Sequence, residues 1–122
     1  MPNAGPLQAS ALAVTANVDG SGVAQVPAGA SFVVVTSGDV VLRVTLPTAV
    51  MGNVVSLFAP GTGFRLQSAA PSAVAINGGQ GLGAAADVAS GMLVRCTCVG
   101  INWLCSQTAA DGSSTPLPPA WV

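Results

Sequence analysis

Apolar and polar residues alternate along several short stretches of this chain. The clearest stretch covers residues 40–46, where every second side chain is apolar: Val40, Leu42, Val44 and Leu46. A repeat of two residues places these side chains on one face of an extended strand. The same alternation over residues 53–58 and 64–68 predicts two further strands. The alternating apolar side chains in them are Val55, Leu57, Phe64 and Leu66.

Turn residues separate these stretches. Asn77-Gly78-Gly79 is the strongest turn signal in the chain, because asparagine and glycine tolerate the positive φ angles of tight hairpin turns. Residues 92–99 and 101–106 are predicted to form the last hairpin, around Gly100. Turn residues at such close spacing favour short strands and leave no room for a helix of ordinary length.

The whole pattern predicts an all-β fold, a compact sandwich or barrel of about eight or nine short strands. Residues 22–26 are included as one of the shorter strands. We expect one all-β domain over residues 12–106. Residues 1–11 contain two prolines and a glycine and are predicted to be an extended N-terminal arm, and the polar, Pro-rich residues 107–122 an extended C-terminal arm.

The residue types that carry most acid–base chemistry are missing from the sequence, which has no His, Lys, Glu or Tyr. General acid–base and nucleophilic catalysis need a group that exchanges protons near neutral pH. We therefore expect no enzymatic activity, although a carboxylate pair for glycoside hydrolysis stays open as an alternative. The charged side chains are Arg43, Arg65, Arg95, Asp19, Asp39, Asp87 and Asp111.

Three cysteines lie in the predicted last hairpin. Cys96 and Cys98 point to one face of its first strand, and the turn brings Cys105 opposite them, with Trp103 facing Cys98. Three thiolates could bind zinc, but a fourth protein ligand is lacking and C-x-C is not the usual zinc spacing. We interpret the cysteines as buried apolar side chains, with a Cys96–Cys105 disulfide as the alternative.

No cofactor or metal is predicted. The glycines of residues 78–83 resemble a phosphate-binding loop only superficially, because no helix follows them and no lysine is present. They are interpreted as turn residues.

Charge and hydropathy restrict the partners. The net charge is −1, charged residues make up 6% of the chain, and three isolated arginines argue against nucleic acid binding. No apolar run reaches the roughly 18 residues of a membrane-spanning helix, and no secretory signal is visible, which predicts synthesis in a cytoplasm. Because so apolar a surface is rare on a monomer, we expect an obligate oligomer.

Trp121 follows the stiff segment Pro116-Leu117-Pro118-Pro119-Ala120 near the C-terminus. A large aromatic side chain on an extended arm suits an anchor that enters a pocket on another subunit. Trp121, Leu117 and Pro118 are therefore the candidate interface residues, and no small-molecule substrate is expected.

Residues 41–106 resemble a β domain of structural proteins of tailed bacteriophages, in particular small capsid decoration (cement) and head-fibre proteins. The matching segments are Val44-Thr45-Leu46-Pro47, Gly52-Asn53-Val54-Val55, Pro60-Gly61-Thr62-Gly63, Ala75-Ile76-Asn77-Gly78 and Ile101-Asn102-Trp103. The resemblance implies a virion protein without catalytic residues, made in the bacterial host. It further implies a homotrimer on the exterior of an icosahedral head, bound to the major capsid protein. The alternative function is a receptor- or glycan-binding module of a head or tail fibre.

Overall fold

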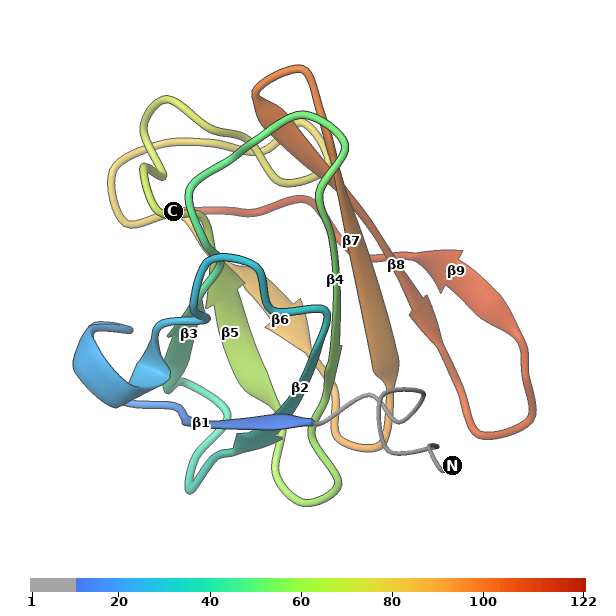
Figure 1. The fold of residues 1–122 in the computed structure, drawn as a ribbon. Helices are drawn as coiled ribbons and strands as arrows, with labels where there is room; N and C mark the ends of the chain where they lie inside the picture. Colours follow the sequence, from blue (N-terminus) through green and yellow to red (C-terminus); the bar gives the residue numbers. More distant parts are fainter. Residues whose placement is uncertain (1–10) are drawn as a thin grey trace, which may run out of the picture.

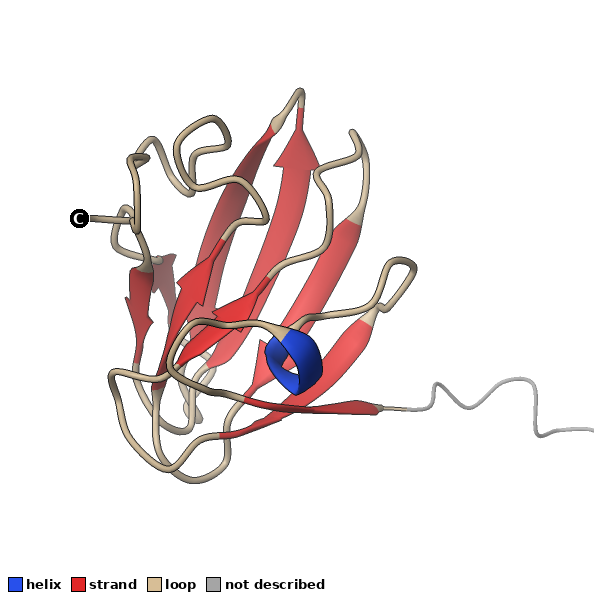
Figure 2. Cartoon of the chain, turned by 90° about the vertical axis from the view of Figure 1, so that its left-hand side faces the viewer, coloured by secondary structure: helices blue, strands red, loops and turns tan. Residues whose placement is uncertain are grey.

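The computed structural model describes residues 11–122, so the predicted arm over residues 1–11 lies almost wholly outside the described residues. The described chain forms nine strands and one turn of 3-10 helix, η2, at Gly22–Ala24 (Figures 1 and 2). This confirms the predicted all-β class. The strands are β1 Leu12–Thr15, β2 Phe32–Thr36, β3 Arg43–Thr45, β4 Val54–Phe58, β5 Phe64–Gln67, β6 Ala86–Val88, β7 Leu93–Val99, β8 Asn102–Thr108 and β9 Ser114–Pro116.

The strands form two mixed sheets. The larger sheet has the order β1-β2-β4-β7-β8-β9, with parallel pairing from β1 to β4 and antiparallel pairing from β4 onward. The smaller sheet has the order β3-β5-β6, with β3 parallel and β6 antiparallel to β5. Strand order leaves both sheets with free edges, so the architecture is sandwich-like and not a closed barrel.

The core lies between the two sheets, because each sheet buries alternate side chains in one common cluster. This is the outcome expected from the alternating pattern, with one apolar face per strand. Its members include Val33, Val55, Leu57 and Val94 of the larger sheet and Val44, Phe64, Leu66 and Ala86 of the smaller, each at most 1% exposed.

Two predicted strands are shorter or absent. In residues 40–46 only Arg43–Thr45 is a strand, because the Asp39 carboxylate and carbonyl accept the backbone N–H groups of Val41 and Leu42 and turn the chain. Val40 is consequently exposed instead of facing the core. In residues 22–26 the 3-10 turn replaces the expected strand, and Gly22 adopts a φ of 59°, which disfavours extended pairing.

Residues 107–122 lie against the domain rather than extending from it as an arm. β8 continues to Thr108, so the predicted boundary at residue 106 falls inside a strand, and β9 pairs antiparallel with β8. Leu117 then enters the core at 1% exposure, and Trp121 pairs with Ala85 beside β6. The sequence of this segment shows no alternation of apolar and polar residues, because single side chains separated by prolines make these contacts.

Candidate functional site

The three cysteines occupy the positions that the hairpin pattern predicts. Cys96 pairs with Cys105 and Cys98 pairs with Trp103, and all three thiols are buried and free. Cys105 Sγ donates a hydrogen bond to Cys96 Sγ over 2.8 Å. Burial, and then the contact with Cys105, raise the pKa of Cys96 well above the ordinary thiol value, and burial raises the pKa of Cys98. Both thiols are therefore neutral and shielded from solvent, which is the opposite of a reactive nucleophile.

Three of the four aspartates stabilise turns. The Asp19 carboxylate accepts hydrogen bonds from the hydroxyl and backbone N–H of Ser21, and Asp111 does the same with Ser113. These bonds lower the pKa of both carboxyl groups. Asp39 holds the turn before β3. Across residues 11–122, no group of three or more His, Cys, Asp or Glu side chains is placed to hold a metal ion.

Asn77 connects the Asn-Gly turn to the C-terminal segment. Its φ of 49° and the positive φ of Gly78 confirm the predicted tight turn, which closes between Ile76 and Gly79. The Asn77 amide donates to the carbonyls of Cys105 and Leu117, and its oxygen accepts the backbone N–H of Cys105. The residue therefore holds three segments together, a structural role that accounts for this turn without a bound phosphate.

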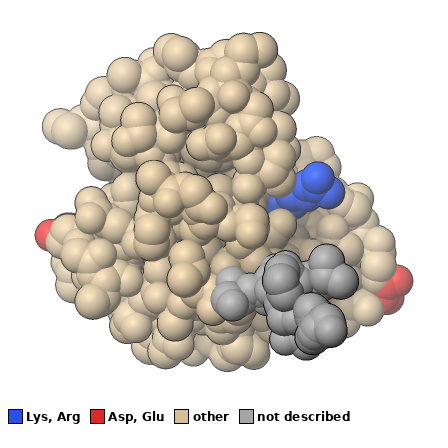
Figure 3. All heavy atoms as spheres, in the orientation of Figure 1, with Lys and Arg blue, Asp and Glu red and all other residues tan. Residues whose placement is uncertain are grey.

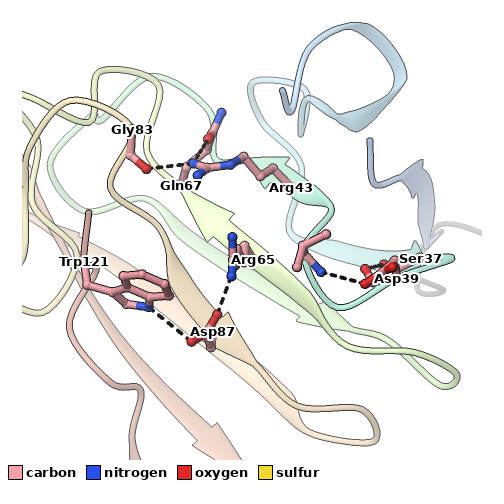
Figure 4. Close-up of polar contacts among 9 residues, drawn as sticks. Ser37, Asp39, Arg43, Arg65, Gln67, Gly83, Asp87 and Trp121 are labelled. Carbon is pink, nitrogen blue, oxygen red and sulfur yellow. Dashed lines mark hydrogen bonds and ion pairs between the residues drawn. The ribbon is translucent and has the colours of Figure 1, made fainter. Parts of the chain in front are cut away.

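The outer face of the smaller sheet carries a group of polar side chains, among them Arg43, Arg65 and Asp87 (Figure 4). Arg65 on β5 and Asp87 on β6 are direct cross-strand partners, and Arg65 Nε lies 3.4 Å from Asp87 Oδ1. Trp121 Nε1 donates to Asp87 Oδ2 over 3.1 Å, and the Arg65 guanidinium lies 5.1 Å from the centroid of the Trp121 ring. We call these three residues, together with Arg43, the arginine–tryptophan face.

Arg43 completes this face from β3. It is paired in register with Arg65, and its Nη1 donates to Gln67 Oε1 and to the carbonyl of Gly83, each over 2.9 Å. Sequence reasoning named these arginines only as isolated charges. The parallel pairing of β3 with β5 brings the two arginines together, and no local sequence pattern predicts that pairing.

The three candidate anchors have different environments. Leu117 is buried in its own domain, so it is not free to reach another subunit. Pro118 is exposed and lines a surface hollow of about 440 Å³, together with Arg65 and Asp87. Trp121 is half exposed, at 49%. The role of Trp121 as an anchor for another subunit stays a prediction.

A second feature is the end of the molecule where loop 47–53 lies beside the tip of the β7–β8 hairpin, residues 99–101 (Figure 1). Backbone hydrogen bonds from Gly52 to Cys98 and from Cys98 to Asn53 join the two. The sequence has no charged residue between Arg43 and Arg65 or between Arg95 and Asp111. In Figure 3 the upper part of the visible face accordingly carries no charged side chain.

This charge-free end, residues 47–53 and 99–101, exposes large apolar side chains instead. Surface clusters of this kind mark contacts with another molecule more often than single exposed residues do. The exposed side chains are Val50, Met51, Val99 and Ile101.

Within residues 11–122, no helix has the length and apolar character needed to cross a bilayer. Comparison of the chain with protein-family models, curated proteins and solved structures found no match.

Proposed function

We propose that this chain is a structural virion protein, a capsid decoration protein that binds the outside of an icosahedral phage head as a trimer and stabilises the shell. The support is the resemblance of residues 41–106 to such proteins, together with a sandwich-like fold whose thiols and turn aspartates serve structure. The role requires a stable fold and an adhesive surface, and it requires no chemistry.

The charge-free end is the observation that carries this proposal. Met51 and Ile101 are 73% and 63% exposed, and Val50 and Val99 extend the same surface. Full burial of a side chain of this size contributes roughly 1.5–3 kcal/mol. A contact through this end needs no charge complementarity, so its strength should depend only weakly on salt.

Stabilisation of the head follows from mass action. A protein that binds the mature shell, and binds disrupted shells less well, lowers the free energy of the intact state. Many copies on one particle multiply a modest contribution per site.

The test uses phage heads that lack the protein. Adding the wild-type chain is expected to raise the temperature at which the heads release DNA. The double variant Met51→Asp/Ile101→Asp is expected to lose this effect, because two carboxylates would be buried without partners. The control variant Val18→Asp/Val23→Asp adds the same charge at two exposed residues outside the charge-free end, and we expect it to raise the release temperature as the wild-type chain does. The proposal is contradicted if the heads release DNA at the same temperature with and without the wild-type chain.

The alternative, a receptor- or glycan-binding module of a fibre, is favoured by a different surface. A half-exposed Trp121 beside Asp87 and Arg65 combines an aromatic platform with hydrogen-bonding groups, as sugar sites do. The arginine–tryptophan face is distinct from the charge-free end, so the two functions can be tested separately.

A further inference from the structure

The arginine–tryptophan face places two like charges at paired positions. Arg43 on β3 and Arg65 on β5 are register partners on neighbouring strands, although the sequence has only three cations. Like charges directly opposite each other destabilise a sheet. A local conflict of this kind is expected where a surface serves binding rather than stability.

The charge on this face is only partly compensated. Asp87 contacts Arg65 through a single guanidinium nitrogen, Nε, at 3.4 Å. Arg43 is oriented by two neutral acceptors, Gln67 Oε1 and the Gly83 carbonyl. Among the described residues, the one ion pair is that between Arg65 and Asp87. The face therefore carries two guanidinium groups against one carboxylate, an excess of one positive charge.

The indole ring of Trp121 borders these charges. Asp87 fixes its edge through the Nε1 hydrogen bond, and about half of the residue stays exposed. A ring held in this way offers apolar area at a small entropic cost, because its orientation is already set.

A surface hollow adjoins two of these four side chains, Arg65 and Asp87. It measures about 440 Å³ and is lined by Arg65, Asp87, Gln107 and Pro118, among others. This volume falls within the range of about 300–1,000 Å³ that is usual for small-ligand sites. The lining combines a cation, a carboxylate, an amide and an apolar ring.

We infer that the arginine–tryptophan face binds an acidic saccharide. The apolar C–H face of a sugar ring would pack on the indole of Trp121, and Asp87 would accept a hydrogen bond from a sugar hydroxyl. The guanidinium groups of Arg65 and Arg43 would bind a carboxylate of the sugar. Arginine suits this role because its planar fork matches a carboxylate. The inference rests on the second of the proposed functions and is independent of shell binding.

The experiment compares tetragalacturonate with its methyl ester by titration calorimetry on the full chain. The ester keeps the sugar rings and removes the charge. We expect tetragalacturonate to bind and the ester to bind at least about tenfold more weakly, since charged hydrogen bonds are lost. Arg65→Gln and Trp121→Ala are each expected to weaken binding by about tenfold or more. Arg95→Gln removes the same charge from β7 of the other sheet and is expected to leave affinity unchanged.

The contacts of Trp121 also hold the C-terminal segment, so a second variant separates binding from folding. Arg43→Gln leaves the Asp87–Trp121 contact intact. It is expected to weaken the binding of tetragalacturonate while preserving the circular dichroism spectrum and the melting temperature of the protein. Absence of binding, equal binding of the ester, or affinity that survives both Arg43→Gln and Trp121→Ala overturns the inference. Equally effective displacement by inorganic sulfate would show a simple anion site and overturn it too. None of these results would affect a measured stabilisation of phage heads, so failure here is distinct from failure of the decoration function.

Discussion

The docking of the C-terminal segment on its own domain depends on one glycine. A Cβ added at Gly79 would lie 2.6 Å from the backbone nitrogen of Ala120 and closer still to its carbonyl oxygen. Real Cβ atoms essentially never approach backbone that closely, so Gly79→Ala must displace Ala120. This displacement breaks the hydrogen bond from Ala120 N–H to the Ile76 carbonyl and loosens Leu117, which is 1% exposed.

The expected cost follows from what the displaced segment buries. Exposing Leu117 costs roughly 1.5–3 kcal/mol. The lost backbone hydrogen bonds add to this cost, and the conformational entropy that the freed segment regains offsets part of it. We predict that Gly79→Ala lowers the free energy of unfolding by about 2 kcal/mol and the melting temperature by roughly 8 °C. Urea unfolding measures the change in the free energy of unfolding. Hydrogen exchange of the backbone amides over residues 114–122 should become faster in the variant.

Gly38→Ala is the matched control, because its added Cβ meets no atom within 4 Å and its φ is not in the left-handed region. Its effect is expected to stay below about 1 kcal/mol. If Gly79→Ala were as stable as Gly38→Ala and exchange over residues 114–122 were unchanged, the C-terminal segment would not pack as described.

Three further predictions concern the core and the titrating groups. Phe64→Ala removes a ring that is 1% exposed and should cost about 3–5 kcal/mol in urea unfolding. Because the pKa of Cys96 is raised in the fold, the contribution of this thiol to the free energy of unfolding should be fully present below the ordinary thiol value of 9.0. Above 9.0 this contribution should fall by about 1.4 kcal/mol per pH unit until the folded thiol ionises, and Cys96→Ala should remove that part of the pH dependence. The Asp19 carboxyl should titrate below 3.8 by NMR, and Ser21→Ala should raise its pKa, since the strongest hydrogen bond to the carboxylate is lost.

Much of the fold could be predicted from local pattern. Alternation identified the buried faces of β4 and β5, and glycine and asparagine identified the turns at residues 77–79 and around Gly100. These features depend on neighbours in the sequence. The pairing of Cys96 with Cys105 followed for the same reason, since a hairpin with a known turn fixes its own register.

The rest depends on contacts that are distant in the sequence. Residues 107–122 show no periodicity, and burial of Leu117 becomes evident only when its position against β8 and the Asn-Gly turn is known. The arginine–tryptophan face requires the parallel pairing of β3 with β5 and the return of Trp121 to β6, more than thirty residues later in the chain. Local propensity gives no information about such pairings.

Cryo-electron microscopy of phage heads with and without the bound chain tests the central proposal most directly. The account predicts threefold density on the exterior of the shell, with Met51 and Ile101 of the charge-free end against the capsid surface. Density confined to a fibre, or heads that show no added density at saturating protein, would contradict it.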